Sequence, residues 1–177
     1  MKKLLLLLSM FSISLCGVSS FEINEVMYNP SGSDNNHEFV EVKLDTLTNL
    51  TNWIISDFTS EDFLVPLQIT NSFYVLIVEE GFNYSEINAS IYSTGTTIGN
   101  NLGNSDDIIV IKNKMGEIVD QFIYDSSLGG DGNNKSLCLF NNSWQECLAT
   151  PGKQNEIELV MEEPLLEDAG ELILTTY

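Results

Sequence analysis

The chain has 177 residues, of which 26 are acidic and seven are lysine, with no arginine, and its net charge at pH 7 is −19. This length suits a single domain with enough chain to bury a core. So acidic a surface repels phosphate backbones, and the chain lacks the arginine fork that phosphate recognition commonly uses. We therefore expect no nucleic-acid partner, and the simplest interpretation of the charge is solubility.

The first 20 residues have the pattern of a secretory signal peptide. Lys2 and Lys3 precede an apolar run over residues 4–18 that ends in small residues. We place cleavage after Ser20, which leaves five basic residues against 26 acidic ones and a net charge of −21. Any membrane contact would come through this leader. An uncleaved anchor is one alternative, but about 15 apolar residues fall short of the roughly 20 that span a bilayer. A secreted or cell-surface protein is the prediction.

The three cysteines divide between the leader and the mature chain. Lipid attachment at Cys16 is one alternative, which Leu15 disfavours because the lipidation signal has a small residue at that place. Cys138 and Cys147 flank a turn-like segment, residues 141–143, and in an exported chain this predicts a disulfide between neighbouring strands. Closing this short loop with a disulfide would contribute roughly 2–3 kcal/mol to the free energy of unfolding. A zinc site is a poor alternative, because it needs about four ligands and the chain has one histidine.

The pattern of apolar residues predicts an all-β chain. Short runs rich in Val, Ile, Phe and Tyr alternate with turns rich in Asn, Gly, Ser and Asp, which favours a two-sheet sandwich over a barrel. In the second run, Val40, Val42 and Leu44 share one face, and Glu41 and Lys43 share the other. We predict strands over residues 22–28, 37–44, 53–56, 63–65, 73–79, 107–113, 117–124, 135–141 and 143–148.

Three segments between and after these strands carry their own predictions. Residues 114–116 form a hairpin turn in which Gly116 takes the left-handed conformation. Residues 81–104 form a long polar excursion over the surface with a helical turn at residues 84–87. Residues 156–177, beyond a Pro-Gly pair, form an acidic linker or the first strand of a following domain, or alternatively a strand that folds back onto the sandwich.

Six short segments follow one another along the chain. They are INEVM at 23–27 with Asn29-Pro30, EFVEV at 38–42, LTNWIISD at 50–57, LGNSDDIIVI at 102–111, GEIVD at 116–120 with Tyr124, and TPGKQN at 150–155. Together they resemble the lamin tail domain in its secreted prokaryotic form. The resemblance covers residues 21–155 and implies an immunoglobulin-like β-sandwich.

The resemblance implies an extracellular or cell-surface module that interacts with a partner, a protein or a glycan, and that is not an enzyme. In nuclear lamins the module is a partner-binding surface. In prokaryotic members it occurs alone or beside hydrolases and surface-protein modules. The alternatives are an accessory domain of a secreted hydrolase, a weak calcium-binding surface domain, and a metal-dependent hydrolase, which would need a compact carboxylate cluster.

Several single residues have both a chemical and a structural interpretation. His37, beside Glu38 and near Asp34, can be drawn as a catalytic relay, but we favour a polar residue at the head of a strand. Trp53 is expected in the core. Asp120 is expected either to face outward or to be buried and satisfied by main-chain amides, with catalysis the weakest alternative.

Calcium is the ligand best suited to the acidic loops, and we expect no other cofactor. Neither of two oxygen-rich clusters has the spacing of a recognised calcium loop, and solvated carboxylates explain both more simply. In the first cluster, Glu38 and Glu41 fall on opposite faces of their strand. The clusters are Asp34, Glu38 and Glu41, and Asp125, Asp131, Asn133 and Asn134 around Gly129-Gly130.

Five asparagines have Ser or Thr two places on and are candidate glycosylation acceptors in an exported chain. Four of them lie in predicted loops or at predicted strand ends, where a glycan has room. They are Asn49, Asn83, Asn88, Asn134 and Asn141.

Overall fold

The structure is a computed structural model that describes residues 21–57 and 59–157. The predicted leader, including Cys16, and nearly all of the predicted linker or extra strand at 156–177 lie outside the described residues. Among the described residues, no helix has the length and apolar character that a membrane span requires.

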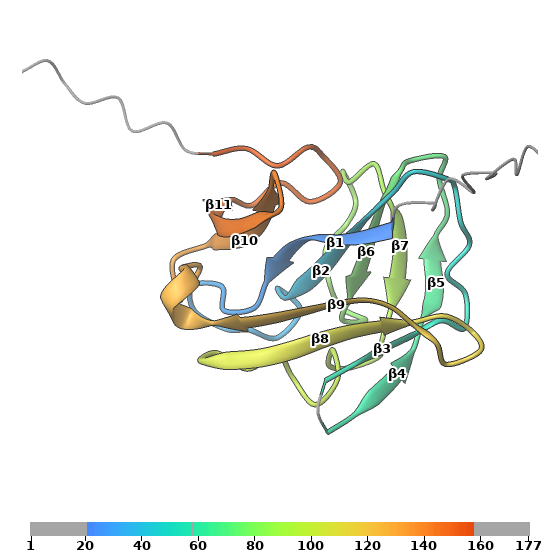
Figure 1. The fold of residues 1–177 in the computed structure, drawn as a ribbon, viewed down its shortest axis with the longest axis horizontal. Coiled ribbons are helices and arrows are strands. Elements are labelled where there is room, and N and C mark those ends of the chain that lie inside the picture. Colours follow the sequence, from blue (N-terminus) through green and yellow to red (C-terminus); the bar gives the residue numbers. More distant parts are fainter. Residues whose placement is uncertain (1–20, 58, 158–177) are drawn as a thin grey trace, which may run out of the picture.

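The described chain is nearly all β and forms two sheets (Figure 1). The seven-stranded sheet has the order β11-β10-β1-β2-β6-β7-β5, and the four-stranded sheet has the order β4-β3-β8-β9. A single 3-10 turn, η1 (Ser126–Leu128), follows β9. The strands are β1 (Phe21–Met27), β2 (Phe39–Leu44), β3 (Ile54–Ser56), β4 (Glu61–Phe63), β5 (Val65–Gln68), β6 (Tyr74–Val78), β7 (Ser90–Ser93), β8 (Asp106–Lys112), β9 (Ile118–Asp125), β10 (Lys135–Phe140) and β11 (Ser143–Leu148).

The main core lies between the two sheets. Val40, Val42 and Leu44 of β2 all face this core, as their alternation predicts, and Ile109 and Ile111 of β8 face it from the other sheet. Aromatic rings extend the core at its margins, with Trp53 stacked on Phe21 at 5.2 Å and Trp144 stacked on Phe122 at 3.6 Å between ring centroids. Trp53 is thus a core-packing residue, as predicted.

A second apolar cluster covers part of the opposite face of the seven-stranded sheet. It contains Met27, Phe39, Leu76, Val78, Ala89 and Ile91. Phe82, Tyr84 and Ile87, from the segment between β6 and β7, pack onto it. The segment predicted as a surface excursion therefore covers part of the sheet. At residues 84–87 it forms a non-helical turn, closed by a hydrogen bond from the Ile87 amide to the Tyr84 carbonyl, where a helical turn was predicted.

Most predicted strands are confirmed to within a few residues, and two predictions are wrong. Residues 63–65 are not one strand: β4 ends at Phe63 in one sheet and β5 begins at Val65 in the other, with buried Leu64 between them. β7 was not predicted, because its first and last residues, Ser90 and Ser93, are polar although they are buried. It runs parallel to β6, a pairing that a local hairpin signal cannot reveal.

The two predicted hairpin features are confirmed. Gly116 has φ 79°, and its amide closes the turn onto the Asn113 carbonyl. Cys138 on β10 and Cys147 on β11 form a disulfide with a Cα–Cα distance of 5.9 Å. The disulfide therefore fastens the edge hairpin of the larger sheet.

Candidate functional site

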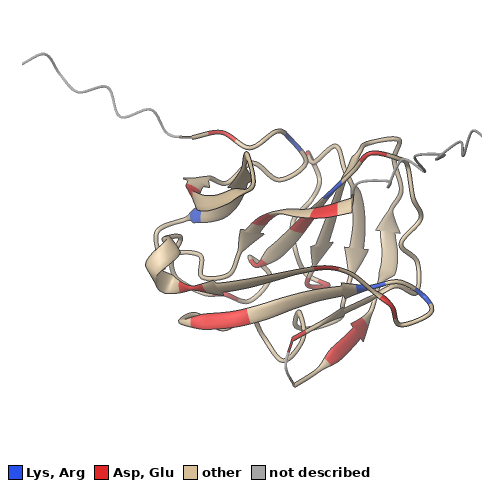
Figure 2. Cartoon of the chain, in the orientation of Figure 1, with Lys and Arg blue, Asp and Glu red and all other residues tan. Residues whose placement is uncertain are grey.

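Four glutamates have no exposed surface at all, although carboxylates rarely lie inside proteins. They form two pairs on opposite faces of the seven-stranded sheet, Glu25 with Glu41 and Glu38 with Glu79. Acidic residues are spread over both sheets and the connecting loops (Figure 2). The buried pairs stand out from this general acidity because each must be neutralised or hydrogen-bonded.

The backbone of β1 places Glu25 directly opposite Glu41 of β2. A register shift between Ile23 and Glu25 marks a bulge at Asn24. The bulge re-aims the end of β1, so that Asn24 and Glu25 are both buried on the side away from the main core. The prediction that Glu41 would face outward with Lys43 is right about the face, but Glu41 is buried because another segment covers it.

That covering segment is the stretch after β11, residues 150–155. The Thr150 amide and hydroxyl donate to the two carboxylate oxygens of Glu25, each at 2.8 Å. The Gly152 amide donates to Oε2 of Glu41 at 2.6 Å. Gly152 has φ 80°, and a Cβ there would lie 2.7 Å from Cγ2 of Ile87, so that a larger residue would both strain the backbone and collide.

Two asparagines complete this arrangement. Asn24 Nδ2 donates to Oε1 of Glu41 at 2.6 Å and to Oδ1 of Asn155 at 2.9 Å. Asn155 Nδ2 donates in return to the Asn24 carbonyl at 2.9 Å. We call Asn24, Glu25, Glu41, Thr150, Gly152 and Asn155 the Glu25–Glu41 network. It joins the first, second and last of the six segments that carry the lamin-tail resemblance.

Burial dominates the electrostatics of this network. It raises the pKa of Glu41 to about 8, against the opposing effect of the hydrogen bonds from Gly152 and Asn24. Burial also raises the pKa of Glu25, against the bonds from Thr150. Each oxygen named here has a donor, so the network is a satisfied structural feature with no oxygen left to act on a substrate.

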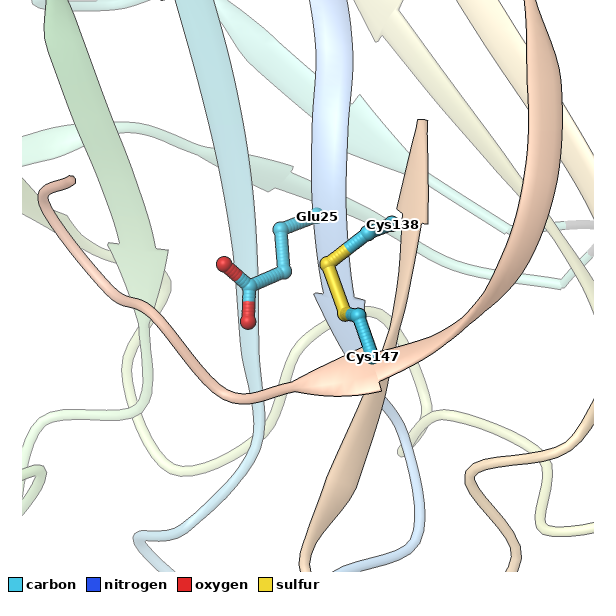
Figure 3. Close-up of side chains that lie close together, drawn as sticks. All are labelled: Glu25, Cys138 and Cys147. Atoms are coloured by element: carbon cyan, nitrogen blue, oxygen red, sulfur yellow. A yellow bond between two sulfur atoms is a disulfide. The ribbon is translucent and has the colours of Figure 1, made fainter. Parts of the chain in front are cut away.

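Glu25 also lies beside the disulfide (Figure 3). Its carboxylate and the sulfurs of Cys138 and Cys147 form the one set of three acidic, histidine or cysteine ligand atoms in the described chain that lie within 4.8 Å of one another. Both sulfurs are bonded to each other, so neither is a thiolate that could bind a metal. This set is therefore not a metal site.

The second pair, Glu38 and Glu79, faces the space between the sheets. Phe39 and Val78 are partners across β2 and β6, so Glu38 and Glu79, the next residues outward, lie opposite one another. Glu79 Oε2 accepts a hydrogen bond from the Asn36 amide. Its Oε1 and both oxygens of Glu38 are buried without a hydrogen-bond partner.

The surroundings of Glu38 are acidic and polar. Burial is the main cause that raises the pKa of Glu38 to about 8, and the negative charges of Glu79, Asp34 and Asp107 act in the same direction. The Leu102 amide opposes this shift, although its geometry does not complete a hydrogen bond. Asp34 and Glu38 were predicted to lie in one cluster, whereas Glu79 was not, because only the strand register brings Glu79 opposite Glu38.

The loop before β8 closes this end of the sandwich. Asp34 Oδ2 accepts from Asn104 Nδ2 at 3.2 Å, and Asp107 Oδ2 accepts from the Gly103 amide at 3.0 Å. The Tyr124 hydroxyl donates to the Gly103 carbonyl at 2.9 Å. The LGNSDD segment and Tyr124, two further parts of the resemblance, thus pack around the Glu38 end of the EFVEV segment.

The structure places His37 and Glu38, two residues of the possible catalytic relay, in different environments. His37 is exposed and its amide bonds to the Asp34 carbonyl at 3.0 Å, whereas Glu38 is enclosed. Glu38 and Glu41 point to opposite sides of the sheet, as predicted, so the first proposed calcium cluster is divided between the two pairs. His37 lies at the head of β2, where we expected a polar residue.

In the second proposed calcium cluster, one side-chain oxygen of each residue accepts a hydrogen bond from the protein. Asp125 Oδ1 caps η1 through the Ser127 amide at 2.9 Å, and Asp131 Oδ1 accepts from Asn29 Nδ2 at 2.5 Å. Asn133 Oδ1 accepts from the Lys135 amide at 3.0 Å. Asn134 Oδ1 accepts from the Ser31 amide at 3.0 Å. These hydrogen bonds give the oxygen-rich side chains of the loop a structural role without a metal ion. Calcium binding to this loop stays a prediction.

Asp120 connects the two sheets. Its Oδ2 accepts from the Ile23 amide of β1 at 2.7 Å, and its Oδ1 accepts from the Gln121 amide at 2.8 Å. The structure therefore supports the interpretation of Asp120 as a carboxylate that accepts hydrogen bonds from main-chain amides. Asp120 is half-buried, whereas that interpretation expected a buried residue.

The five candidate glycosylation acceptors are all exposed. Attachment of a glycan at any of them stays a prediction. They are Asn49, Asn83, Asn88, Asn134 and Asn141.

No family model, curated protein or solved structure matches this chain.

Proposed function

We propose that this chain is an extracellular or cell-surface interaction module of the lamin-tail type, an immunoglobulin-like sandwich that binds a partner protein and does not catalyse a reaction. Two observations support the type. Four of the six segments that carry the resemblance, together with Tyr124, are scattered over the sequence yet meet around two buried glutamate pairs. A disulfide between the edge strand β11 and its neighbour β10 fits an oxidising, extracellular compartment.

The observation that carries the binding role is the outer face of the four-stranded sheet. Phe63, Ile118 and Ile123 are 64%, 61% and 63% exposed there. The strand register places Phe63 and Ile118 in one row across β4, β3, β8 and β9, through Ile54 and Lys112.

Ile123 lies beside Ile108 on the same face, since Ile109 and Ile111 point the opposite way into the core. Large apolar side chains gathered on one face of a soluble protein mark an interaction surface. We call Phe63, Ile118 and Ile123 the apolar face.

A protein partner fits this face better than a glycan does. Phe63, Ile118 and Ile123 are aromatic or aliphatic, and burying such side chains is the main source of affinity in protein interfaces. Glycan recognition depends on polar groups that match sugar hydroxyls, and in the row from Phe63 to Ile118 the one polar side chain is Lys112, which is paired with Glu61.

The test is saturable binding of the labelled full-length exported protein to the surface of cells from its source. We expect the double variant Phe63→Ser/Ile123→Ser to reduce binding at least tenfold, and Leu47→Ser, which removes an exposed apolar side chain outside both sheets, to leave it unchanged. Treating the cells with protease should abolish binding. Binding that survives protease but not glycosidase, or that the double variant retains, would refute the proposal.

A further inference from the structure

The Glu38–Glu79 pair is electrostatically incomplete. Three of its four carboxylate oxygens are enclosed by protein without a hydrogen-bond donor. Like charges directly opposite on neighbouring strands destabilise a sheet, and burial makes the repulsion stronger. The Glu25–Glu41 network shows how this protein satisfies a comparable pair with main-chain and side-chain donors. At Glu38 the Leu102 amide approaches the carboxylate but does not complete a hydrogen bond.

No ion pair within the described residues compensates the two glutamates. The two ion pairs in residues 21–57 and 59–157 are Lys112–Glu61 and Lys135–Glu146, and neither involves Glu38 or Glu79. His37 acts electrostatically on Glu79 but is itself exposed to solvent. The other charges that act on Glu38, those of Asp34 and Asp107, are negative.

We propose that the Glu38–Glu79 pair holds a calcium ion between the two sheets, at the end of the sandwich where the turn of residues 34–37 meets the loop of residues 102–107. The ion would bind the oxygens of Glu38 and Oε1 of Glu79, with main-chain or water oxygens completing its shell. Asp34 adds negative charge from a position outside the ligand set, since its oxygens do not form a three-carboxylate group with those of the two glutamates.

The donor chemistry selects calcium among common metals. The unpartnered atoms of Glu38 and Glu79 are hard carboxylate oxygens, whereas zinc prefers nitrogen and sulfur. Magnesium keeps several waters in a regular octahedron, which an enclosed site between strand ends accommodates poorly. Calcium takes six to eight oxygens in irregular geometry. Extracellular modules bind it with dissociation constants of about 0.1–1 mM, which matches an exported protein.

The bound ion would fasten three segments that meet there. Glu38 precedes β2, Glu79 follows β6, and Leu102 belongs to the loop that leads into β8. Calcium would therefore link one end of the larger sheet to the loop that enters the smaller one. This effect is separate from partner binding through the apolar face, which lies on the outside of the smaller sheet.

The test compares melting temperatures of the full-length protein, stripped of metal, with and without about 10 mM CaCl₂ or MgCl₂. We expect calcium to raise Tm by roughly 5 °C when it exceeds Kd about a hundredfold, and magnesium to raise it much less. Glu38→Gln and Glu79→Gln should each abolish the calcium shift. Glu41→Gln, a buried glutamate on the opposite face of the same strand, should retain it.

A second measurement covers variants that fold poorly. Tyr124 lies near enough to Glu38 for their charges to interact, so its ring should sensitise terbium luminescence at the site, and calcium should quench the signal by displacement. Three results would overturn the proposal: no calcium-dependent shift, which would leave a shared proton between the glutamates; a shift that both Gln variants retain; or a shift that Asp131→Asn abolishes, which would place the ion in the loop of residues 125–134.

Discussion

Thr150 donates both its amide and its hydroxyl to the carboxylate of Glu25, 125 residues earlier in the chain, each at 2.8 Å. The bond joins the segment after the last strand to the first strand. It lies on the face of the larger sheet away from the main core, where an unpaired carboxylate would otherwise be buried. The segment of residues 150–155 therefore works as part of the fold rather than as a loose end.

Replacing Thr150 with valine should destabilise the domain, because the variant keeps the side-chain shape but removes one donor from a buried carboxylate. We expect a loss of roughly 1–3 kcal/mol in the free energy of unfolding, measured by urea titration. Thr48→Val is the matched control, since the Thr48 hydroxyl bonds only to the Thr46 carbonyl on an exposed turn. Equal losses in the two variants would contradict the role given to Thr150.

Stability should fall as pH rises from about 4.5 to about 8. Burial raises the pKa of Glu41 from 4.5 to about 8, so between these values the folded state holds a proton that the unfolded state has released. Its stabilising contribution is complete below pH 4.5 and is lost by pH 8, with a slope of up to about 1.4 kcal/mol per pH unit. The buried Glu25 acts in the same direction.

Urea titrations across this pH range, in the presence of chelator, measure the slope. Glu41→Gln should reduce it, because an amide does not titrate. Glu156→Gln, an exposed position on the same C-terminal segment, should not change it. A wild-type slope of zero or of opposite sign would show that Glu41 is ionised throughout.

The strands were predictable from sequence because their signals are local. Val40, Val42 and Leu44 alternate as a half-buried strand must, and they do face the core. The same alternation placed Glu41 at the surface. That prediction is wrong because residues more than 100 positions later in the chain cover this face of the sheet. Alternation tells which side a residue faces but not what lies on that side.

The candidate site was less predictable because it depends on pairing between distant strands. Asp34 and Glu38 were recognised as a cluster from their proximity in sequence. Glu79 becomes the partner of Glu38 only through the register of β2 against β6, and that register is set by packing of both strands. Likewise β7 is recognised by its parallel pairing with β6, since Ser90 and Ser93 hide its pattern.

Removing the disulfide should lower stability by about 2–3 kcal/mol, because the nine-residue separation of Cys138 and Cys147 no longer restricts the unfolded chain. The double variant Cys138→Ser/Cys147→Ser, compared with the wild type by urea titration, measures this loss. Adding a reductant to the wild type should give the same loss, and adding it to the double variant should have no effect. A reductant that leaves the wild type unchanged would mean that the bond does not form in the folded protein.

Asp120 should contribute to the joining of the two sheets. Its carboxylate on β9 accepts the Ile23 amide of β1, beside the bulge that directs Glu25 into its network. Replacing Asp120 with alanine leaves that amide without its acceptor in a half-buried position, which should cost roughly 1–3 kcal/mol. Asp106→Ala, on the neighbouring strand with its side chain exposed, should cost less than about 0.5 kcal/mol. Hydrogen exchange gives the more specific readout: the Ile23 amide should exchange faster in Asp120→Ala, while the amides of β10 keep their protection. Uniform acceleration over both strands would instead indicate a general loss of stability, with no particular role for the bond between the sheets.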